Sequence, residues 1–420
     1  MRLPGDHSSS LALAVWWSLL LVLVGSSSPA LGCYTRIFSF GDSLTDTGNF
    51  VRLTARSPSL YGAPPYGKTF FGRPTGRASD GRLVIDFIAQ EFGLANVTAI
   101  QAGTAPGDFQ HGANFAIISA TANNGSFFTG NGMDINPYSL DTQMLWFRSH
   151  LRSQQQNGSD VLGGALVALG EIGGNDYNFA FSSGVAREKV RAFVPAVVDK
   201  LGAAVEELIG MGARALVVPG NLPFGCAPLY LRRFGGAAAR AAWDYDPRTG
   251  CLAWFNRFAE YHNRLLNARL DAIRRRHPDV TIVYADWYGA MMSIFQAPGQ
   301  LVVGWTGLYI HTNVLLLRTG WYRVSLGYSS LSPTAILRPT PDVVLSPPFD
   351  AGITNALLSC CGNTTVPCGR PGCSVCDDPS TYGSWDGTHP TEAVYKVIAD
   401  GVLHGPYASP VPLAKTCTPS

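Results

Sequence analysis

Ser43 is the first residue of the chain whose surroundings suit nucleophilic chemistry. The apolar side chains of residues 37–40 alternate with Ser39 and predict a buried strand that ends at Gly41. The polar residues 42–46 follow directly and are typical of the first turn of a helix. A serine at such a junction lies at the carboxyl edge of a sheet, and the N–H groups of a helix N-terminus suit a developing oxyanion. The alternative is that Ser43 only caps the helix.

Asp386 and His389 form a second candidate group near the end of the chain. They stand three residues apart in the loop SWDGTHP, residues 384–390. A serine hydroxyl is a weak nucleophile until a base takes its proton, and neutral imidazole is a base that works near neutral pH. A carboxylate on the other ring nitrogen holds the tautomer and stabilises the imidazolium. One loop can supply both groups if its backbone turns suitably; the alternative is a surface loop in which Asp386 caps the next helix.

The segments that would position these residues alternate between predicted strands and predicted helices. Besides residues 37–40, strands are predicted at residues 114–119, 162–170, 214–219 and 280–286, and helices at residues 81–92, 187–211, 251–277 and 391–403. Residues 61–80 form a loop rich in Pro, Gly and aromatic residues, which either shapes a cleft or is a plain surface loop. Strands that alternate with helices predict a parallel sheet covered on both faces.

Four motifs occur in a specific order along the chain. They are GDSLTDTGN at residues 41–49, GANFA at 112–116, GEIGGNDYN at 170–178 and DGTH at 386–389. With these motifs the chain resembles the plant GDSL esterase/lipase family of SGNH hydrolases, from about residue 33 to residue 407. Each motif is a weak signal alone, whereas four in this order are a strong one.

The resemblance implies a fold, an activity and a set of site residues. The implied fold is α/β, a flavodoxin-like three-layer α/β/α sandwich with a parallel sheet, and the implied activity is ester hydrolysis. Ser43 would be the nucleophile, His389 the general base and Asp386 its orienting carboxylate. The oxyanion would be bound by the Ser43 backbone N–H and the Asn175 side-chain amide. This chemistry needs no metal and no organic cofactor.

Ser119 departs from the pattern of the family. Relatives have a glycine at this position, and its backbone N–H is the third oxyanion donor. The N–H of Ser119 can serve equally if the backbone conformation tolerates a Cβ atom, whereas a positive φ would cost strain. We expect a suitable backbone, so that Ser119→Gly would change the rate little and destabilise the fold slightly.

The N-terminal residues and the cysteines indicate the secretory pathway. Residues 1–32 combine Arg2, an apolar run and a small-x-small site, which predicts a signal peptide cleaved before Cys33; a signal anchor is the alternative. All nine cysteines lie from residue 33 onward, where disulfides are favoured over a metal site and an odd count leaves one thiol over. Glycosylation is expected at the sequons of Asn96, Asn124, Asn157 and Asn363.

One hydrolase domain is expected over residues 33–410, followed by a C-terminal tail at residues 411–420. Residues 301–347 interrupt this domain, because relatives reach the CCG segment at residues 360–362 sooner. This stretch is either a surface subdomain or a retained intron of the gene model, and the second is slightly favoured.

Composition and charge narrow the classes of function. The chain has 420 residues, 46% of them hydrophobic and 14% charged, which describes a globular protein. A net charge of +2 gives no reason to expect nucleic acid as a partner, and no stable membrane anchor is expected. The favoured hypothesis is a secreted esterase, extracellular or in the cell wall, that acts on O-acetyl esters such as those of xylan or on a small-molecule ester. The alternatives are a lipase for longer acyl esters and, because of Ser119, a non-catalytic wall-binding glycoprotein.

Overall fold

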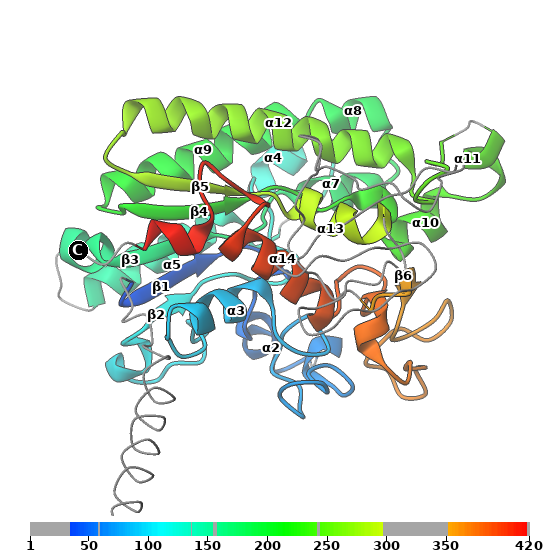
Figure 1. Cartoon of the computed structure of the whole chain (residues 1–420), viewed down its shortest axis with the longest axis horizontal. Helices are drawn as coiled ribbons and strands as arrows, with labels where there is room; N and C mark the ends of the chain where they lie inside the picture. Colours follow the sequence, from blue (N-terminus) through cyan, green and yellow to red (C-terminus); the bar gives the residue numbers. More distant parts are fainter. Residues whose placement is uncertain are drawn as a thin grey trace, which may run out of the picture.

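A mainly parallel sheet forms the centre of the molecule (Figure 1). This computed structural model describes residues 34–57, 59–135, 137–153, 158–241, 244–296 and 352–417. The predicted signal peptide, Asn157 and the predicted insertion at residues 301–347 lie outside the described residues.

The central sheet has six strands within the described residues, in the order β2-β1-β3-β4-β5-β8. All pairs are parallel except β5 with β8. The strands are β1 (Arg36–Phe40), β2 (Gly112–Asn114), β3 (Ala165–Leu169), β4 (Ala215–Pro219), β5 (Thr281–Ala285) and β8 (Ala408–Ser409). The order 2-1-3-4-5 is that of flavodoxin-like folds, in which ligands bind where the strand order reverses, beyond the carboxyl ends of β1 and β3. The predicted fold class is therefore confirmed.

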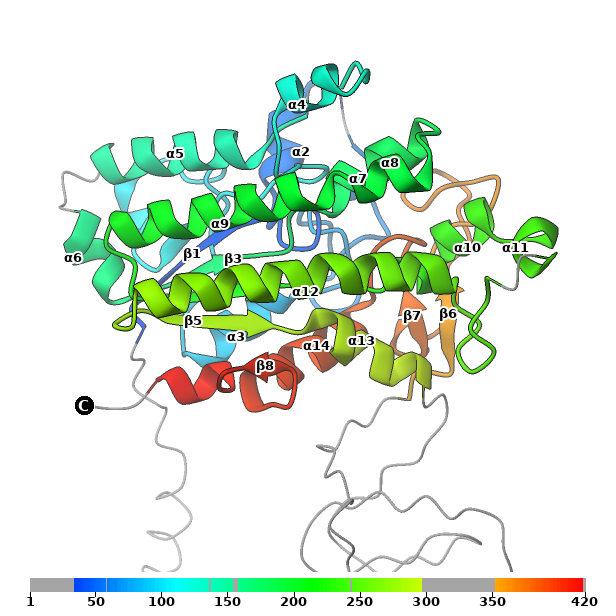
Figure 2. The same ribbon diagram turned by 90° about the horizontal axis from the view of Figure 1, so that it is seen from above.

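Two layers of helices cover the two faces of this sheet, as Figure 2 shows from above. One layer consists of α5 (Leu140–Ser153), α9 (Val194–Gly210) and α12 (Ala253–Arg276), and the other of α3 (Val84–Glu91), α13 (Trp287–Gln296) and α14 (Glu392–His404). Side chains alternate between the layers along each strand. In β1, Phe38 and Phe40 pack in the first layer and Ile37 in the second, which explains the alternating apolar pattern of this segment.

The remaining elements are short and lie around this core. They are α2 (Asn49–Leu53), α4 (Gly125–Gly130), α6 (Gly158–Gly163), α7 (Gly174–Ser182), α8 (Arg187–Arg191), α10 (Pro228–Phe234), α11 (Ala237–Ala241), and a two-stranded sheet of β6 (Asn355–Ser359) and β7 (Tyr382–Ser384). Past residue 410, Leu413 is buried against the layer of α14, so the chain still packs on the domain there.

Most of the predicted elements are confirmed, and three predictions are wrong. The strand predicted at residues 114–119 ends at Asn114. The N–H groups of Phe115 and Ile117 still donate to the carbonyls of Ser39 and Gly41, at 2.7 and 3.1 Å, but the Gly41 N–H donates to the side chain of Gln143 and the regular ladder stops. The helix predicted at residues 187–211 is two helices, α8 and α9, with Pro195 in the first turn of α9. No helix begins at Asp42, as described below.

Disulfides link the segments next to the C-terminal motif. Cys360 pairs with Cys376, Cys361 with Cys368, and Cys226 with Cys251. Of the cysteines that the structure describes, Cys373 is the free thiol. The prediction of disulfides in place of a metal site is confirmed for these pairs.

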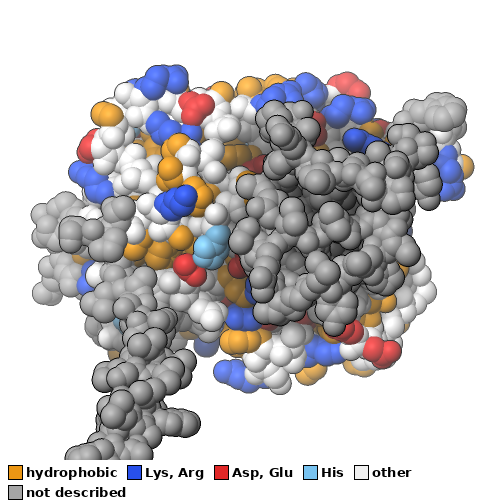
Figure 3. All heavy atoms as spheres, viewed as in Figure 1, with side chains coloured by type: hydrophobic (Ala, Val, Ile, Leu, Met, Phe, Trp, Pro, Cys, Tyr) orange, Lys and Arg blue, Asp and Glu red, His pale blue; other side chains and the backbone are white. Residues whose placement is uncertain are grey.

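The distribution of charge on the surface and the length and polarity of the helices are relevant to possible partners. Figure 3 shows basic and acidic side chains interspersed on the visible face, in keeping with the net charge of +2. Within the described ranges, every helix is too short or too polar to cross a membrane.

Candidate active site

Ser43 lies in a tight turn directly after β1. The N–H groups of Thr45 and Asp46 both donate to the carbonyl of Asp42, at 3.1 and 2.9 Å, and close this turn. The helix predicted here starts later, as α2 at Asn49, because the Asp46 carboxylate caps that helix instead. It accepts the N–H groups of residues 48, 49 and 50 at 2.7, 2.6 and 3.0 Å. The expected helix N-terminus at Ser43 is therefore wrong, and Ser43 rests on a single turn.

His389 and Asp386 are brought together by the turn of their own loop. One oxygen of Asp386, Oδ1, accepts the backbone N–H groups of Thr388 and His389 at 3.0 and 2.9 Å. Gly387 between them has a φ of +96°, which favours glycine. The other oxygen, Oδ2, accepts from His389 Nδ1 at 2.7 Å. The three-residue spacing thus lets one carboxylate fix both the loop and the ring.

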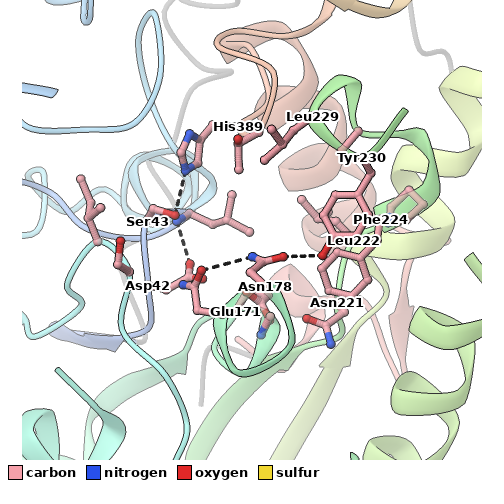
Figure 4. A pocket seen from close by; sticks show the side chains of 18 of the residues that line it. Asp42, Ser43, Glu171, Asn178, Asn221, Leu222, Phe224, Leu229, Tyr230 and His389 are labelled. Atoms are coloured by element: carbon pink, nitrogen blue, oxygen red, sulfur yellow. Dashed lines mark hydrogen bonds between the residues drawn. The ribbon is translucent and has the colours of Figure 1, made fainter. Parts of the chain in front are cut away.

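The imidazole of His389 spans the distance between this carboxylate and Ser43. Its Nε2 lies 2.8 Å from Ser43 Oγ, and Figure 4 shows the two side chains pointing toward each other. With Nδ1–H donating to Asp386, Nε2 carries the lone pair and the serine hydroxyl donates to it. The structure therefore brings together Ser43, His389 and Asp386, although Ser43 and His389 lie 346 residues apart in the sequence.

The charges of this pair favour the protonated imidazole and the ionised carboxylate. Burial lowers the pKa of His389, but the charge and hydrogen bond of Asp386, with the charge of Asp42, outweigh it and raise the pKa above its ordinary value. Burial raises the pKa of Asp386, but His389 and two backbone N–H groups outweigh it and hold that pKa below its ordinary value. An imidazolium formed at His389 is thus stabilised.

Sequence reasoning missed a second side-chain donor to Asp386. The hydroxyl of Tyr66 donates to Asp386 Oδ2 at 2.8 Å, on the same oxygen that faces His389. Tyr61 from the same loop packs edge-on against the His389 ring, with 5.8 Å between ring centroids. The aromatic content of residues 61–80 was the available signal, and this loop contacts the site directly.

Two backbone N–H groups at the site are free to bind an oxyanion. Those of Ser43 and Ser119 have no hydrogen-bond partner among the described residues, and both residues line the same cavity. Ser119 has a φ of +67°, and within the described part of the chain no other non-glycine residue has a positive φ. Its conformation is therefore the one that a glycine adopts without strain.

Asn175, at the start of α7, lies on the same cavity but its amide is already engaged. Its Nδ2 donates to Asp42 Oδ2 at 2.8 Å and to the carbonyl of Ala120 at 3.0 Å. Its Oδ1 accepts from Asn178 at 3.2 Å. These contacts hold the amide in one orientation beside Ser43.

The cavity next to Ser43 is small and mostly apolar. Its volume is about 160 Å³. Apolar side chains that line it include Leu44, Ile118, Leu222, Phe224 and Met291. On the opposite side, the hydroxyl of Tyr230 donates to Asn178 at 2.5 Å (Figure 4). In the described residues, no group of three or more His, Cys, Asp or Glu side chains is placed to hold a metal ion.

The positive φ of Ser119 reverses the stability expected for Ser119→Gly. A left-handed conformation costs an L-residue roughly 1–2 kcal/mol, whereas the added freedom of an unfolded glycine costs about 0.5–1 kcal/mol. We therefore expect the variant to be more stable by about 0.5–1 kcal/mol, measured by denaturant unfolding. Because Ser119 lines the cavity and its N–H has no partner among the described residues, kcat should change by less than about threefold. A tenfold rise in kcat would show that the serine misdirects this donor.

The sequons at Asn96, Asn124 and Asn363 are exposed, as glycan acceptors must be. Asn124 also caps α4, since its side chain accepts the N–H of Ser126 at 3.2 Å.

Comparisons with known proteins agree over nearly the whole chain. A family model described as GDSL-like Lipase/Acylhydrolase matches residues 37–402. One GDSL esterase/lipase of Arabidopsis thaliana is 37% identical, covering 97% of this chain and 93% of its own. Another from that plant is 38% identical, covering 92% and 89%. The sinapine esterase of Brassica napus is 35% identical, covering 93% and 90%.

Proposed function

The chain belongs to the GDSL-like lipase/acylhydrolase family and is a carboxylic ester hydrolase, and from this premise we propose that it removes short acyl groups, above all acetyl, from hydroxylated substrates. The observation that carries this proposal is the hydrogen-bonded chain from Ser43 through His389 to Asp386, at the wall of a cavity of about 160 Å³.

In the first half of the reaction, Ser43 is the nucleophile. Its Oγ attacks the carbonyl carbon of the ester while His389 Nε2 takes the hydroxyl proton. The carbonyl oxygen becomes an oxyanion and accepts the N–H groups of Ser43 and Ser119. Asn175 is the third donor, with one amide hydrogen shared between its present acceptor and the oxyanion.

The second half of the reaction returns the enzyme to its starting state. The imidazolium of His389, held by Asp386, gives its proton to the departing alcohol oxygen as the ester C–O bond breaks, which leaves an acyl group on Ser43. A water molecule then attacks this acyl group, with His389 again taking the proton. Collapse of that intermediate releases the carboxylic acid and returns the proton to Ser43.

The size of the cavity favours a short acyl group. A cavity of about 150 Å³ holds a molecule of the size of benzene, so that one of about 160 Å³ accepts an acyl group of roughly six heavy atoms. The alcohol part of the substrate lies outside, next to the aromatic loop of residues 61–80, which suits an acetylated carbohydrate such as cell-wall xylan. The lipase alternative requires room for a longer chain.

We expect kcat/KM for p-nitrophenyl esters to fall by about tenfold or more from acetyl to octanoyl, because forcing extra methylene groups against a packed wall costs about 1–3 kcal/mol. Leu222→Ala, which widens the cavity, should recover part of this loss. Release of acetate from acetylated xylan tests the natural substrate class. Faster turnover of the octanoyl ester would favour the lipase alternative.

We also propose that the protein acts outside the cell, after removal of residues 1–32. Three disulfides in the described part of the chain support an oxidising compartment. The exposed sequons support passage through the glycosylation pathway.

A further inference from the structure

Glu171 is a buried carboxyl group beside the nucleophile turn that the reaction above does not use. It lies two residues beyond β3 and is 4% exposed. Its backbone carbonyl accepts the N–H of Asp42 at 3.0 Å, and its Oε1 accepts the N–H of Gly174 at 3.1 Å, at the start of α7. Glu171 therefore connects the nucleophile turn to the helix that carries Asn175.

The carboxyl group of Glu171 also lies within hydrogen-bonding reach of that of Asp42, and both residues line the cavity. Two carboxyl groups form a hydrogen bond only when a proton lies between them, since two carboxylates in contact repel each other. Asp42 acts as an acceptor on both oxygens, with the Leu44 N–H on Oδ1 at 2.9 Å and the Asn175 amide on Oδ2 at 2.8 Å. The proton therefore belongs to Glu171, which donates it to Asp42.

The charged surroundings agree with a single negative charge on this pair. The titratable groups that face it are Asp46 of the same turn, Asp176 and Tyr177 of α7, Tyr395 of α14, Tyr61 and His389. Of these, only the imidazole can carry a positive charge. Burial raises the pKa of Asp42 to about 6. Burial, followed by the charge of Asp42, raises the pKa of Glu171 well above its ordinary value.

We propose that Asp42 and Glu171 share one proton and act as a pair of positioning residues for ester hydrolysis. Neutral Glu171 donates to the Asp42 carboxylate, which in turn holds the Leu44 N–H and the Asn175 amide, so that the turn of Ser43 and the third oxyanion donor keep one relative placement. The positioning part of this inference rests on the proposed function, whereas the shared proton does not.

The shared proton is tested by infrared spectroscopy of the full mature protein at pH 8. Wild type should show the C=O stretch of a protonated carboxylic acid, which is separate from that of carboxylates, and Glu171→Gln should lack it. Asp176→Asn is the matched control, because burial raises the pKa of Asp176 only to about 6 and this group is ionised at pH 8. An identical carboxylic-acid band in wild type and Glu171→Gln would overturn the proposal.

The positioning role is tested by two substitutions of Glu171. Glutamine can donate an N–H to Asp42 and accept from Gly174, whereas methionine has a similar length and can do neither. We expect Glu171→Met to lower kcat by about tenfold to a hundredfold, since a displaced oxyanion donor costs up to 10²–10³. Glu171→Gln should rescue most of this loss, with KM similar in both variants.

Three results separate the possible failures. If Glu171→Gln is as slow as Glu171→Met, a charged Glu171 is needed and the shared proton is wrong. If a folded Glu171→Met retains full kcat, the pair has no positioning role. If Ser43→Ala is fully active, the proposed function fails, but the infrared result stands by itself because it requires no turnover.

Discussion

Ser43→Ala is expected to lower kcat/KM for an acetyl ester by about 10³-fold or more. The substitution removes the oxygen that attacks the carbonyl carbon, and the residues of a Ser-His-Asp group act as a unit, so that losing one loses nearly the whole contribution. The measurement is steady-state hydrolysis of p-nitrophenyl acetate, together with mass spectrometry of the acyl group trapped on the wild-type protein.

A matched control separates this effect from a general disturbance of the fold. Ser293 lies on α13 with its hydroxyl donating to the carbonyl of Ala290 at 2.7 Å, and Ser293→Ala should keep normal activity. Both variants should melt within a few degrees of wild type, because each loses one hydrogen bond worth about 1 kcal/mol. Activity of Ser43→Ala within tenfold of wild type would reject Ser43 as the nucleophile.

His389→Asn is expected to lower kcat/KM by a similar factor. The pH dependence of kcat/KM follows from the pKa of His389, which Asp386 raises. Only the neutral imidazole can take the serine proton, so kcat/KM should rise with pH. Because the pKa of His389 is raised, the midpoint of this rise should lie above 6.5, the ordinary histidine value. Asp386→Asn removes the charge that raises this pKa, so the midpoint should move to lower pH.

The expected loss of kcat/KM differs between substitutions of Asp386 and of His389. Asp386→Asn should lower kcat/KM less than His389→Asn, because the imidazole remains as a base. His404→Asn is the matched control, since His404 lies at the exposed end of α14. A flat profile from pH 5 to 8 with a normal acyl-enzyme would contradict the role of His389.

The sequence allowed the meeting of Ser43, His389 and Asp386 to be predicted because the decisive contacts are local or follow from the fold. Asp386 and His389 are three residues apart, and a turn over that distance brings carboxylate and ring together. Alternating apolar residues predicted the strands, and the carboxyl ends of β1 and β3 meet at one edge of a parallel sheet. Ser43 and Asn175 follow these two ends, so their proximity could be expected from chain order.

The sequence did not predict the backbone conformations near the site. The polar residues 42–46 were compatible with a helix, but Asp46 uses its carboxylate to cap α2 and leaves Ser43 in a turn. Residues 115–118 were apolar enough for a strand, yet one of them, Ile118, donates its N–H to Asp46 at 2.9 Å. Such competition between local side-chain contacts and regular hydrogen bonding cannot be read from residue type.

What the sequence by itself determined is therefore the fold class and the three residues, Ser43, His389 and Asp386, that the structure brings together. Only the tertiary structure decided the positive φ of Ser119, the contact of Tyr66 with Asp386 across 320 residues, and the burial of Glu171 beside Asp42. The physical reason is that a hydrogen bond between distant segments depends on distances of a few tenths of an ångström, which are set by packing of the whole domain. Burial then shifts the pKa values of these groups. A carboxyl group removed from water keeps its proton, whereas one paired with a positive charge loses it.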